Sequence, residues 1–390
     1  MDFINRFFDL PDRSCFIFGP RGTGKSTWLR NRLPSAVYLD LLDPRLTREF
    51  MANPDQIREH IPRRDGSTTV IVDEIQRVPQ LLSVIHALLE EPNPPKFIMT
   101  GSSARKLRRQ NVDLLGGRAV LRAFHPFMAA ELPSFQLDEA LVSGTLPLIV
   151  AAQDPVDVLN SYINLYVDEE VRTEALTRNV ERFIRFLEGV SFSHASLLNV
   201  SNVARECHVP RNVVESYVAI LLDLLLAYQV PVFSKRAKRK LVAHSKFYLF
   251  DAGIFRTLRP TGPLDRPSEI DGAALKGLVS QNLKAWTDYR KGDSKLYFWR
   301  TRAGSEIDFI VYGRENFVAI EVKNSDRITS QDVRALNAFV SDYPQASPVL
   351  LYRGEAPLEV RGVLCLPVGM FLRSLAPHES LDSVIESCVN

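Results

Sequence analysis

The sequence predicts a mixed α/β protein with several domains, and three observations support this prediction. The chain has 390 residues, more than the roughly 100–200 residues of one ordinary domain. Short apolar runs alternate with helical stretches between about residues 14 and 127, and a different pattern of helices and strands follows residue 190. We therefore expect a parallel-sheet domain over residues 1–130, a helical lid or connector over 131–190, a winged helix-turn-helix over 191–262 and a second α/β domain over 263–390.

The composition is that of a globular protein without a strong bias in charge. Hydrophobic residues make up 45% and charged residues 24%, which excludes a mainly disordered, collagen-like or coiled-coil chain. The 48 Lys and Arg against 46 Asp and Glu leave a net charge of +2, so binding to nucleic acid requires a local basic patch. The four cysteines form no CxxC pair, which argues against a disulfide framework or a zinc site. Without a signal pattern or a long apolar stretch, we expect a cytoplasmic protein with no membrane partner.

Four continuous apolar runs predict the strands of the first domain. A strand that is covered on both faces is apolar throughout and does not alternate with polar residues, which is typical of a parallel sheet between helices. The runs lie at residues 15–18, 36–39, 69–72 and 96–99.

A phosphate-binding loop follows the first of these strands and precedes a helical stretch. Its residues are Gly19, Pro20, Arg21, Gly22, Thr23, Gly24, Lys25 and Ser26, with Thr27 next. The glycines allow backbone N–H groups to turn toward phosphates, Lys25 reaches the β- and γ-phosphates, and the Ser26 hydroxyl ligates magnesium. Because the chain lacks the Asn-Lys-x-Asp tetrad that reads guanine, the predicted cofactors are ATP and Mg²⁺.

The third run ends in two acids, Asp73 and Glu74. Asp73 is expected to bind the magnesium ion, directly or through water, and Glu74 to polarise the attacking water. The pair follows the phosphate loop by about fifty residues, which favours a hydrolysing site.

Two further residues are candidates for contact with the phosphates. Ser102, in Thr100-Gly101-Ser102-Ser103, follows the fourth run, where a hydroxyl can sense the γ-phosphate; the alternative is a plain strand-ending turn. Arg118, after Gly116-Gly117, can act as an arginine finger on the phosphates of this or a neighbouring subunit; the alternative is an ordinary surface arginine.

A helix-turn-helix pattern with a basic segment predicts a nucleic-acid interface. Residues 199–206 and a helix opened by Pro210 flank a tight turn at 207–209. Five cations follow and can neutralise phosphates on a wing: Lys235, Arg236, Lys238, Arg239 and Lys240. Arg211, at the start of the second helix, is placed for contact with bases. DNA or another nucleic acid is the expected partner; the alternatives are a solvated loop or a contact between subunits.

Two strand candidates near the C-terminus carry an acidic pair with a lysine. Side chains alternate along a strand, so Glu321 and Lys323 share a face, and an antiparallel neighbour can bring Asp308 beside them. Two carboxylates suit magnesium or manganese, and the lysine can help to activate a water that attacks phosphate. A solvated strand face is the alternative.

Together these residues resemble prokaryotic AAA-type ATPases that carry a winged-helix segment and a C-terminal PD-(D/E)xK nuclease-like domain of unknown function. The resemblance covers nearly the whole chain and rests on residues 19–27, 73–76, 100–105, 115–118, 246–251, 306–309 and 320–323. It implies an AAA-type ATPase core and a restriction-endonuclease-like fold for the C-terminal domain. Family members tend to carry a glutamate on the helix before the acidic pair, and Lys276 stands at that position here. A cation there lowers affinity for a metal, which puts cleavage in doubt.

The leading hypothesis is an ATPase whose nucleotide cycle moves its winged-helix and nuclease-like half on DNA. An ATP-gated, metal-dependent nuclease and an ATP-dependent protein-interaction switch without DNA activity are the alternatives. An arginine finger acting on a neighbour would require a homo-oligomer. The natural substrate, the pathway and the oligomeric state do not follow from the sequence.

Overall fold

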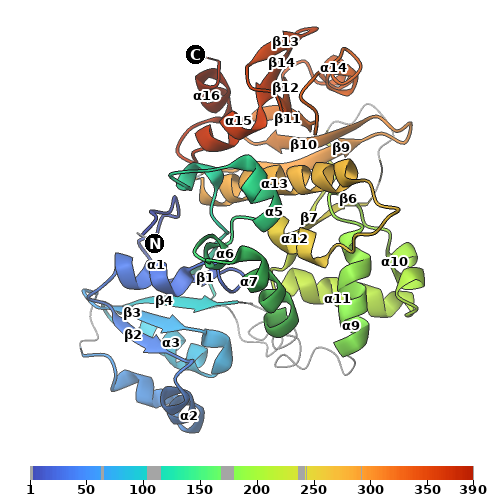
Figure 1. The fold of residues 1–390 in the computed structure, drawn as a ribbon. Helices are drawn as coiled ribbons and strands as arrows, with labels where there is room; N and C mark the ends of the chain where they lie inside the picture. Colours follow the sequence, from blue (N-terminus) through green and yellow to red (C-terminus); the bar gives the residue numbers. More distant parts are fainter. Residues whose placement is uncertain are drawn as a thin grey trace. The chain divides into compact units, whose positions relative to one another are not determined.

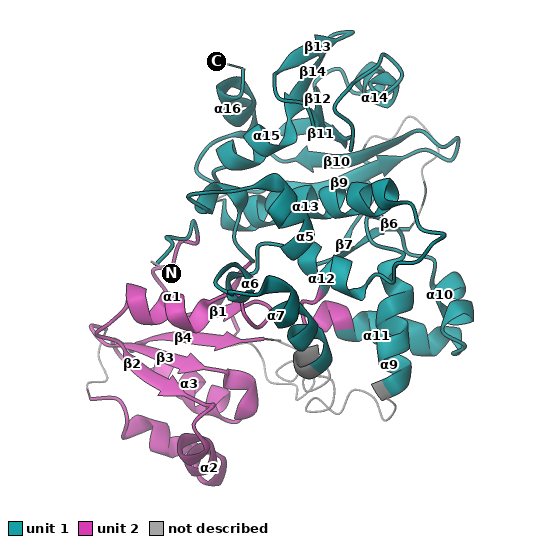
Figure 2. Ribbon diagram, viewed as in Figure 1, with its two compact units in different colours: residues 1–7, 126–220, 227–390 teal, residues 8–125, 221–226 magenta. Residues whose placement is uncertain are grey.

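A computed structural model describes residues 3–62, 66–102, 116–167, 180–235, 242, 244–290 and 292–389 (Figure 1). Figure 2 shows two compact units. The P-loop unit holds Phe8–His125 and Leu221–Leu226, and the large unit holds Met1–Phe7, Pro126–Ile220 and Ala227–Asn390. The first unit boundary lies close to the one expected at residue 130, while the expected division of 131–390 into three parts stays a prediction.

The P-loop unit is built on a five-stranded parallel sheet in the order β2-β3-β4-β1-β5. Its strands are β1 (Cys15–Phe18), β2 (Val37–Asp40), β3 (Thr69–Asp73), β4 (Lys96–Gly101) and β5 (Val120–Ala123). The four strands predicted from apolar runs are confirmed. The sequence reasoning did not predict β5, because this edge strand contains Arg122 and is partly exposed.

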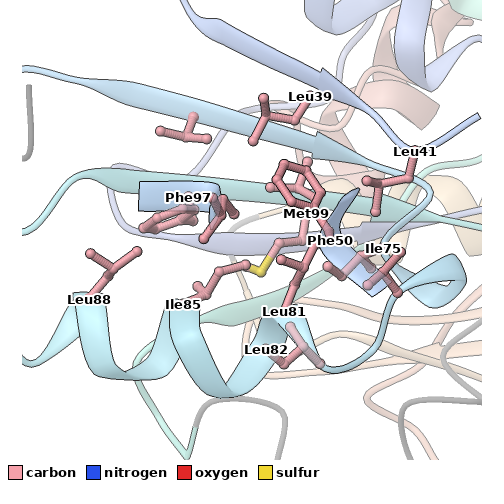
Figure 3. Close-up of a cluster of buried hydrophobic side chains, with 14 of the residues drawn as sticks. Leu39, Leu41, Phe50, Ile75, Leu81, Leu82, Ile85, Leu88, Phe97 and Met99 are labelled. Atoms are coloured by element: carbon pink, nitrogen blue, oxygen red, sulfur yellow. The ribbon is translucent and has the colours of Figure 1, made fainter. Parts of the chain in front are cut away.

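Helices α1 (Lys25–Arg32), α2 (Pro44–Ala52) and α3 (Leu81–Leu89) accompany this sheet. Figure 3 shows Ile85 and Leu88 of α3 facing Phe97 on β4, with Met99 beside them. All four side chains are fully buried, so α3 covers one face of the sheet with an apolar stripe. Two short 3₁₀ helices, Pro54–Arg58 and Ile75–Arg77, also lie in this unit.

The large unit begins with short helices where a helical connector was expected. They are α5 (Leu137–Ser143), α6 (Pro147–Val150), α7 (Pro155–Ser161) and α9 (Val180–Ser191), with a 3₁₀ turn at Ala129–Glu131 and a π-helix at Tyr162–Val167. Prolines open α6 and α7 at the first helical position, where a missing backbone N–H costs no hydrogen bond.

The predicted pair of helices follows as α10 (Val200–Glu206) and α11 (Arg211–Asp223). A three-stranded antiparallel sheet lies in the same stretch, in the order β6-β8-β7. Its strands are β6 (Ser196–Leu197), β7 (Ala227–Val230) and β8 (Lys246–Leu249), and α12 (Ala252–Leu258) comes next. Both helices and the strand at 246–250 are confirmed as elements.

The C-terminal part contains a six-stranded mixed sheet in the order β13-β14-β12-β11-β10-β9. Its strands are β9 (Lys295–Arg300), β10 (Glu306–Tyr312), β11 (Phe317–Val322), β12 (Ser347–Tyr352), β13 (Leu358–Val360) and β14 (Val363–Pro367). The helices are α13 (Pro267–Tyr289), α14 (Arg334–Asp342), α15 (Val368–Ser374) and α16 (Leu381–Ser387). Buried Trp299, Phe339 and Leu350 belong to one core cluster that joins this sheet to α14. Among the helices that the structure describes, none is long and apolar enough to cross a bilayer.

Candidate functional site

The phosphate loop connects β1 to α1 with the backbone geometry that its glycines permit. Gly22 and Gly24 have φ values of 81° and 85°, in the left-handed region that favours glycine. A side chain at Gly19 would place its Cβ 2.1 Å from the Phe124 carbonyl oxygen. The loop ends at Lys25, the first residue of α1, so the helix N-terminus opens onto it.

Two side chains of this segment form hydrogen bonds within the loop itself. The Lys25 ammonium donates to the carbonyls of Gly19 (2.6 Å) and Pro20 (3.1 Å), and the Thr23 hydroxyl donates to Pro20 (2.8 Å). Ser26 and Thr27 occupy the first turn of α1, and Arg21 is exposed in the loop. These groups and the helix terminus fit the phosphates of a nucleotide.

Asp73 lies at the carboxyl end of β3 with only 2% of its surface exposed. The hydroxyl of Thr100, on neighbouring β4, donates to one carboxylate oxygen, and the phenol of Tyr38, on β2, donates to the other. Ser26 also hydrogen-bonds the phenol. Burial, together with the hydrogen bond to Asp73, raises the pKa of Tyr38 to about 12. Ser26 and Asp73, the two predicted magnesium ligands, thus converge on one hydroxyl group, and their oxygens suit the ion.

Glu74 and Ser102 also come together at this edge of the sheet. The Glu74 backbone is left-handed (φ 61°), and its N–H donates to the Thr100 hydroxyl (3.3 Å). The Gln76 amide donates to the Glu74 carboxylate and lies 3.2 Å from the Ser102 hydroxyl. Ser103 and the rest of that motif lie outside the described residues.

Arg118 lies at the opposite edge of the sheet from the phosphate loop. It precedes β5, whose Val120 pairs with Cys15 in parallel, while the loop leaves the other end of β1. About 13 Å of strand separates the two ends, four residues at about 3.3 Å each. The Arg118 guanidinium pairs with Glu90 (2.7 Å). Arg118 therefore lies about one strand length from the phosphate loop of its own chain, and its role as an arginine finger, on this or a neighbouring subunit, stays a prediction.

The C-terminal acidic pair is brought together as the strand alternation predicts. Asp308 on β10 is fully buried, and its N–H donates to the Glu321 carboxylate on β11 (3.3 Å). Lys323 lies 3.1 Å from the same glutamate. The Oδ1 atom of Asp308 also accepts hydrogen bonds from the ammonium groups of Lys246 (3.0 Å) and Lys276 (2.7 Å).

Burial and neighbouring charges together give the two acids opposite pKa shifts. Burial disfavours the charged form of Asp308, but the ammonium groups of Lys276 and Lys246 outweigh it and hold the pKa of this carboxyl well below its usual range. Burial, and next the charge of Asp308, raise the pKa of Glu321 to about 7.

The arrangement around Asp308 does not fit a divalent metal ion. Two ammonium groups fill Oδ1, and the Val322 N–H donates to Oδ2 (3.1 Å), so a cation would have to displace a lysine or use the one acceptor direction left on Oδ2. A cation beside Lys246 and Lys276 would meet two positive charges in a buried setting. Within the part of the chain that the structure describes, no group of three or more His, Cys, Asp or Glu side chains is placed to hold a metal.

The ends of the predicted wing are attached to β9. Phe233 donates its N–H to the Phe298 carbonyl (2.7 Å), and Val242 donates to the Arg300 carbonyl (3.2 Å). The Lys235 ammonium lies 4.3 Å from the centre of the Tyr312 ring. The other four cations of the segment, Arg236, Lys238, Arg239 and Lys240, lie outside the described residues. Arg211, at the start of α11, is exposed and pairs with Glu215 (2.9 Å).

Three segments of the chain match known protein families. Residues 11–133 match an AAA domain. The match supports an AAA-type P-loop ATPase with nucleotide-binding function and overlaps most of the P-loop unit. Residues 134–265 and 271–371 match two separate domains of unknown function.

Two uncharacterized mycobacterial proteins are similar to this chain over most of its length. One is from Mycobacterium bovis and the other from Mycobacterium tuberculosis. Each is 25% identical over 348 residues, which covers 86% of this chain and 76% of the relative. The likeness therefore extends beyond the AAA-type segment.

Sequence reasoning missed Tyr38 and Gln76 in the AAA-type segment and Lys246 in the large unit. Tyr38 reaches Asp73 because β2 lies beside β3, and strand order cannot be read from local sequence. Gln76 and Lys246 stood inside motifs 73–76 and 246–251, but neither motif indicated a partner. In the second motif, Asp251 caps α12 by accepting the N–H of Gly253 (2.8 Å) and also accepts the N–H of Thr145 (2.9 Å).

Proposed function

We propose that this protein binds ATP with magnesium at the phosphate loop and hydrolyses it. The observation that carries the proposal is the convergence of Ser26, Asp73 and Glu74 at one sheet edge, beside a loop with the backbone of a phosphate site. The AAA-type match over residues 11–133 supports the same nucleotide.

Each residue has a distinct part in the proposed reaction. Backbone N–H groups of residues 21–24 and the Lys25 ammonium bind the phosphates, and Lys25 leaves its loop carbonyls to do so. Ser26 and Asp73 would hold magnesium, which, when bound, neutralises charge on the phosphate oxygens. Glu74 accepts a proton from the attacking water, and Ser102 donates to a γ-phosphate oxygen.

Steady-state ATP turnover tests this proposal, with Lys25→Ala as the blank. Glu74→Gln should retain nucleotide binding and lose turnover by about 100-fold or more, because it removes the proton acceptor and keeps the shape. Turnover in Glu74→Gln equal to that of the unaltered protein would contradict the assignment. Turnover no higher than the Lys25→Ala blank would contradict ATP hydrolysis itself.

We further propose that residues 191–262 form a winged helix that binds DNA through its basic segment. Two helices joined by a short turn are followed by antiparallel β7 and β8, and the basic residues lie in the connection between these strands, as in a winged helix. The described residues at both ends of that connection, Phe233 and Val242, donate backbone hydrogen bonds to β9. Arg211 forms an ion pair with Glu215, so its proposed contacts with bases require this ion pair to open first.

Removing charge from the segment tests DNA binding. The joint replacement of Lys238, Arg239 and Lys240 by alanine should weaken binding to DNA and reduce its salt dependence, by about 0.9 in the log–log slope for each phosphate that is no longer neutralised. Alanines at Arg45, Arg48 and Arg361, which are exposed in the structure, remove the same charge elsewhere and serve as the control. Equal affinities in all three proteins would favour the protein-interaction switch.

The contacts of Lys246 and Lys276 with Asp308 argue against the alternative of an ATP-gated nuclease. We infer that the C-terminal domain keeps a nuclease-like arrangement of Asp308, Glu321 and Lys323 but carries internal ion pairs where a metal would be required. If Arg118 acts as an arginine finger on a neighbouring chain, the protein must form a homo-oligomer.

A further inference from the structure

Gln76 joins the ends of two neighbouring strands of the AAA-type segment. Its Nε2 atom donates to the Glu74 carboxylate, just after β3, and lies 3.2 Å from the Ser102 hydroxyl, just after β4. Because an ionised carboxylate only accepts hydrogen bonds, the amide nitrogen must face Glu74. One amide group therefore contacts both the proposed proton acceptor and the proposed γ-phosphate contact.

The local fold is shaped to hold this amide. The left-handed backbone of Glu74 turns the chain from β3 into the 3₁₀ helix Ile75–Arg77, which carries Gln76 back to the strand ends. Gly101 leaves the necessary room, because a Cβ at that position would lie 2.3 Å from the Gln76 Oε1 atom. Gln76 is only 6% exposed, and its Oε1 atom accepts no hydrogen bond from the described protein groups.

A buried oxygen without a hydrogen bond lowers the stability of the fold, so packing alone does not explain a glutamine at this position. The amide nitrogen makes both contacts while the oxygen makes none. The polar contacts of Gln76 are therefore made by its amide N–H donors. Both partners, Glu74 and Ser102, take part in the proposed reaction.

We propose that Gln76 is a positioning residue for ATP hydrolysis. It holds the Glu74 carboxylate in place to accept the proton of the attacking water, and it couples that carboxylate to Ser102, so that a shift of Ser102 on the γ-phosphate moves the proton acceptor. This inference rests on the proposed ATP hydrolysis and adds to it the link between phosphate contact and water activation.

The first test separates nucleotide binding from turnover. Gln76→Ala should lower kcat by about 10- to 100-fold, because the carboxylate loses its anchor, while affinity for a fluorescent ATP analogue with magnesium changes by less than about threefold. Gln80→Ala is the matched control, since Gln80 is exposed before α3 and makes no capping hydrogen bond with its side chain. The Gln80→Ala protein should keep the kcat and the nucleotide affinity of the unaltered protein.

A double-mutant cycle with Glu74→Gln distinguishes positioning from a general structural role. If Gln76 acts through Glu74, then Gln76→Ala should cause no further loss of single-turnover rate in the Glu74→Gln protein. Independent, multiplied losses would overturn the proposal, as would a Gln76→Ala protein that keeps its kcat or exceeds it. A fall in nucleotide affinity that matches the fall in turnover would also overturn it, because the residue would then support the whole loop.

The same measurements keep the two proposals apart. An unaltered protein that turns over ATP no faster than Lys25→Ala contradicts ATP hydrolysis, and the role of Gln76 falls with it. An active unaltered protein with an equally active Gln76→Ala variant contradicts only the role of Gln76.

Discussion

The ammonium group of Lys276 lies 2.7 Å from the carboxylate of Asp308, on the same oxygen that Lys246 approaches to 3.0 Å. Lys276 belongs to α13 and Lys246 to β8, so two distant parts of the chain bring positive charge to one fully buried acid on β10. The charge that a metal ion would supply in a nuclease-like site is thus provided by side chains.

Lys276→Glu is expected to create affinity for a divalent metal. It removes one ammonium group from Asp308 and adds a carboxylate beside Asp308 and Glu321. In an Asp73→Asn background, which weakens the magnesium site of the phosphate loop, calorimetry should detect Mn²⁺ binding at least about tenfold tighter than without the lysine change. Lys295→Glu, which makes the same charge change at an exposed position of β9, is the control. Saturable Mn²⁺ binding that is present with Lys276 and absent in Asp308→Asn would contradict the interpretation of Asp308 as an ion-paired acid.

The raised pKa of Glu321 predicts that stability falls as pH rises. Its pKa is about 7 in the folded chain against an ordinary 4.5, so between these values the unfolded chain binds fewer protons than the folded one. The contribution to stability is full below about pH 4.5, declines up to about pH 7 and is then constant. Relative to the unaltered protein, Glu321→Gln should gain about 1–3 kcal/mol in free energy of unfolding between pH 5 and pH 8. Urea unfolding of both proteins at pH 5 and pH 8 measures these free energies. A difference between the two proteins that is the same at both pH values would refute the prediction.

Tyr38→Phe is expected to lower the magnesium concentration that gives half-maximal ATP turnover. The phenol donates to Asp73 and is hydrogen-bonded by Ser26, so it competes for both predicted ligands of the ion. Removing a hydrogen bond worth about 1 kcal/mol should shift the midpoint about three- to fivefold. Tyr343→Phe, which loses a hydroxyl bonded to the Lys235 carbonyl in the large unit, is the control. A higher midpoint in Tyr38→Phe would show that the phenol supports the ion.

Arg118 is expected to act only between chains. Arg118→Ala should lower turnover by about 1,000-fold if the residue stabilises phosphate charge in a neighbour. Mixing this variant with Lys25→Ala should restore part of the activity, because one partner keeps the loop and the other keeps the arginine. Arg122→Ala, exposed on β5, should keep full activity. Loss of activity without recovery on mixing would contradict the trans role.

Local patterns predict most of the residues of the candidate nucleotide site. The glycines of residues 19–24 and the lysine and hydroxyl that follow form one continuous segment, and the two acids at the end of β3 form another. Their predicted roles depend on backbone geometry that short segments adopt by themselves. Continuous apolar runs located four strands for the same reason, because burial on both faces determines their residue types.

The tertiary structure decided which side chains meet. Tyr38 contacts Asp73 because β2 pairs with β3, Arg118 lies away from its own phosphate loop because β5 runs parallel to β1, and Lys246 reaches Asp308 across 62 residues. These contacts depend on strand order, direction and register, which long-range packing sets and no local pattern encodes. The sequence therefore determined a phosphate loop and an acidic pair near the C-terminus, while the fold alone showed that two lysines neutralise one of those acids.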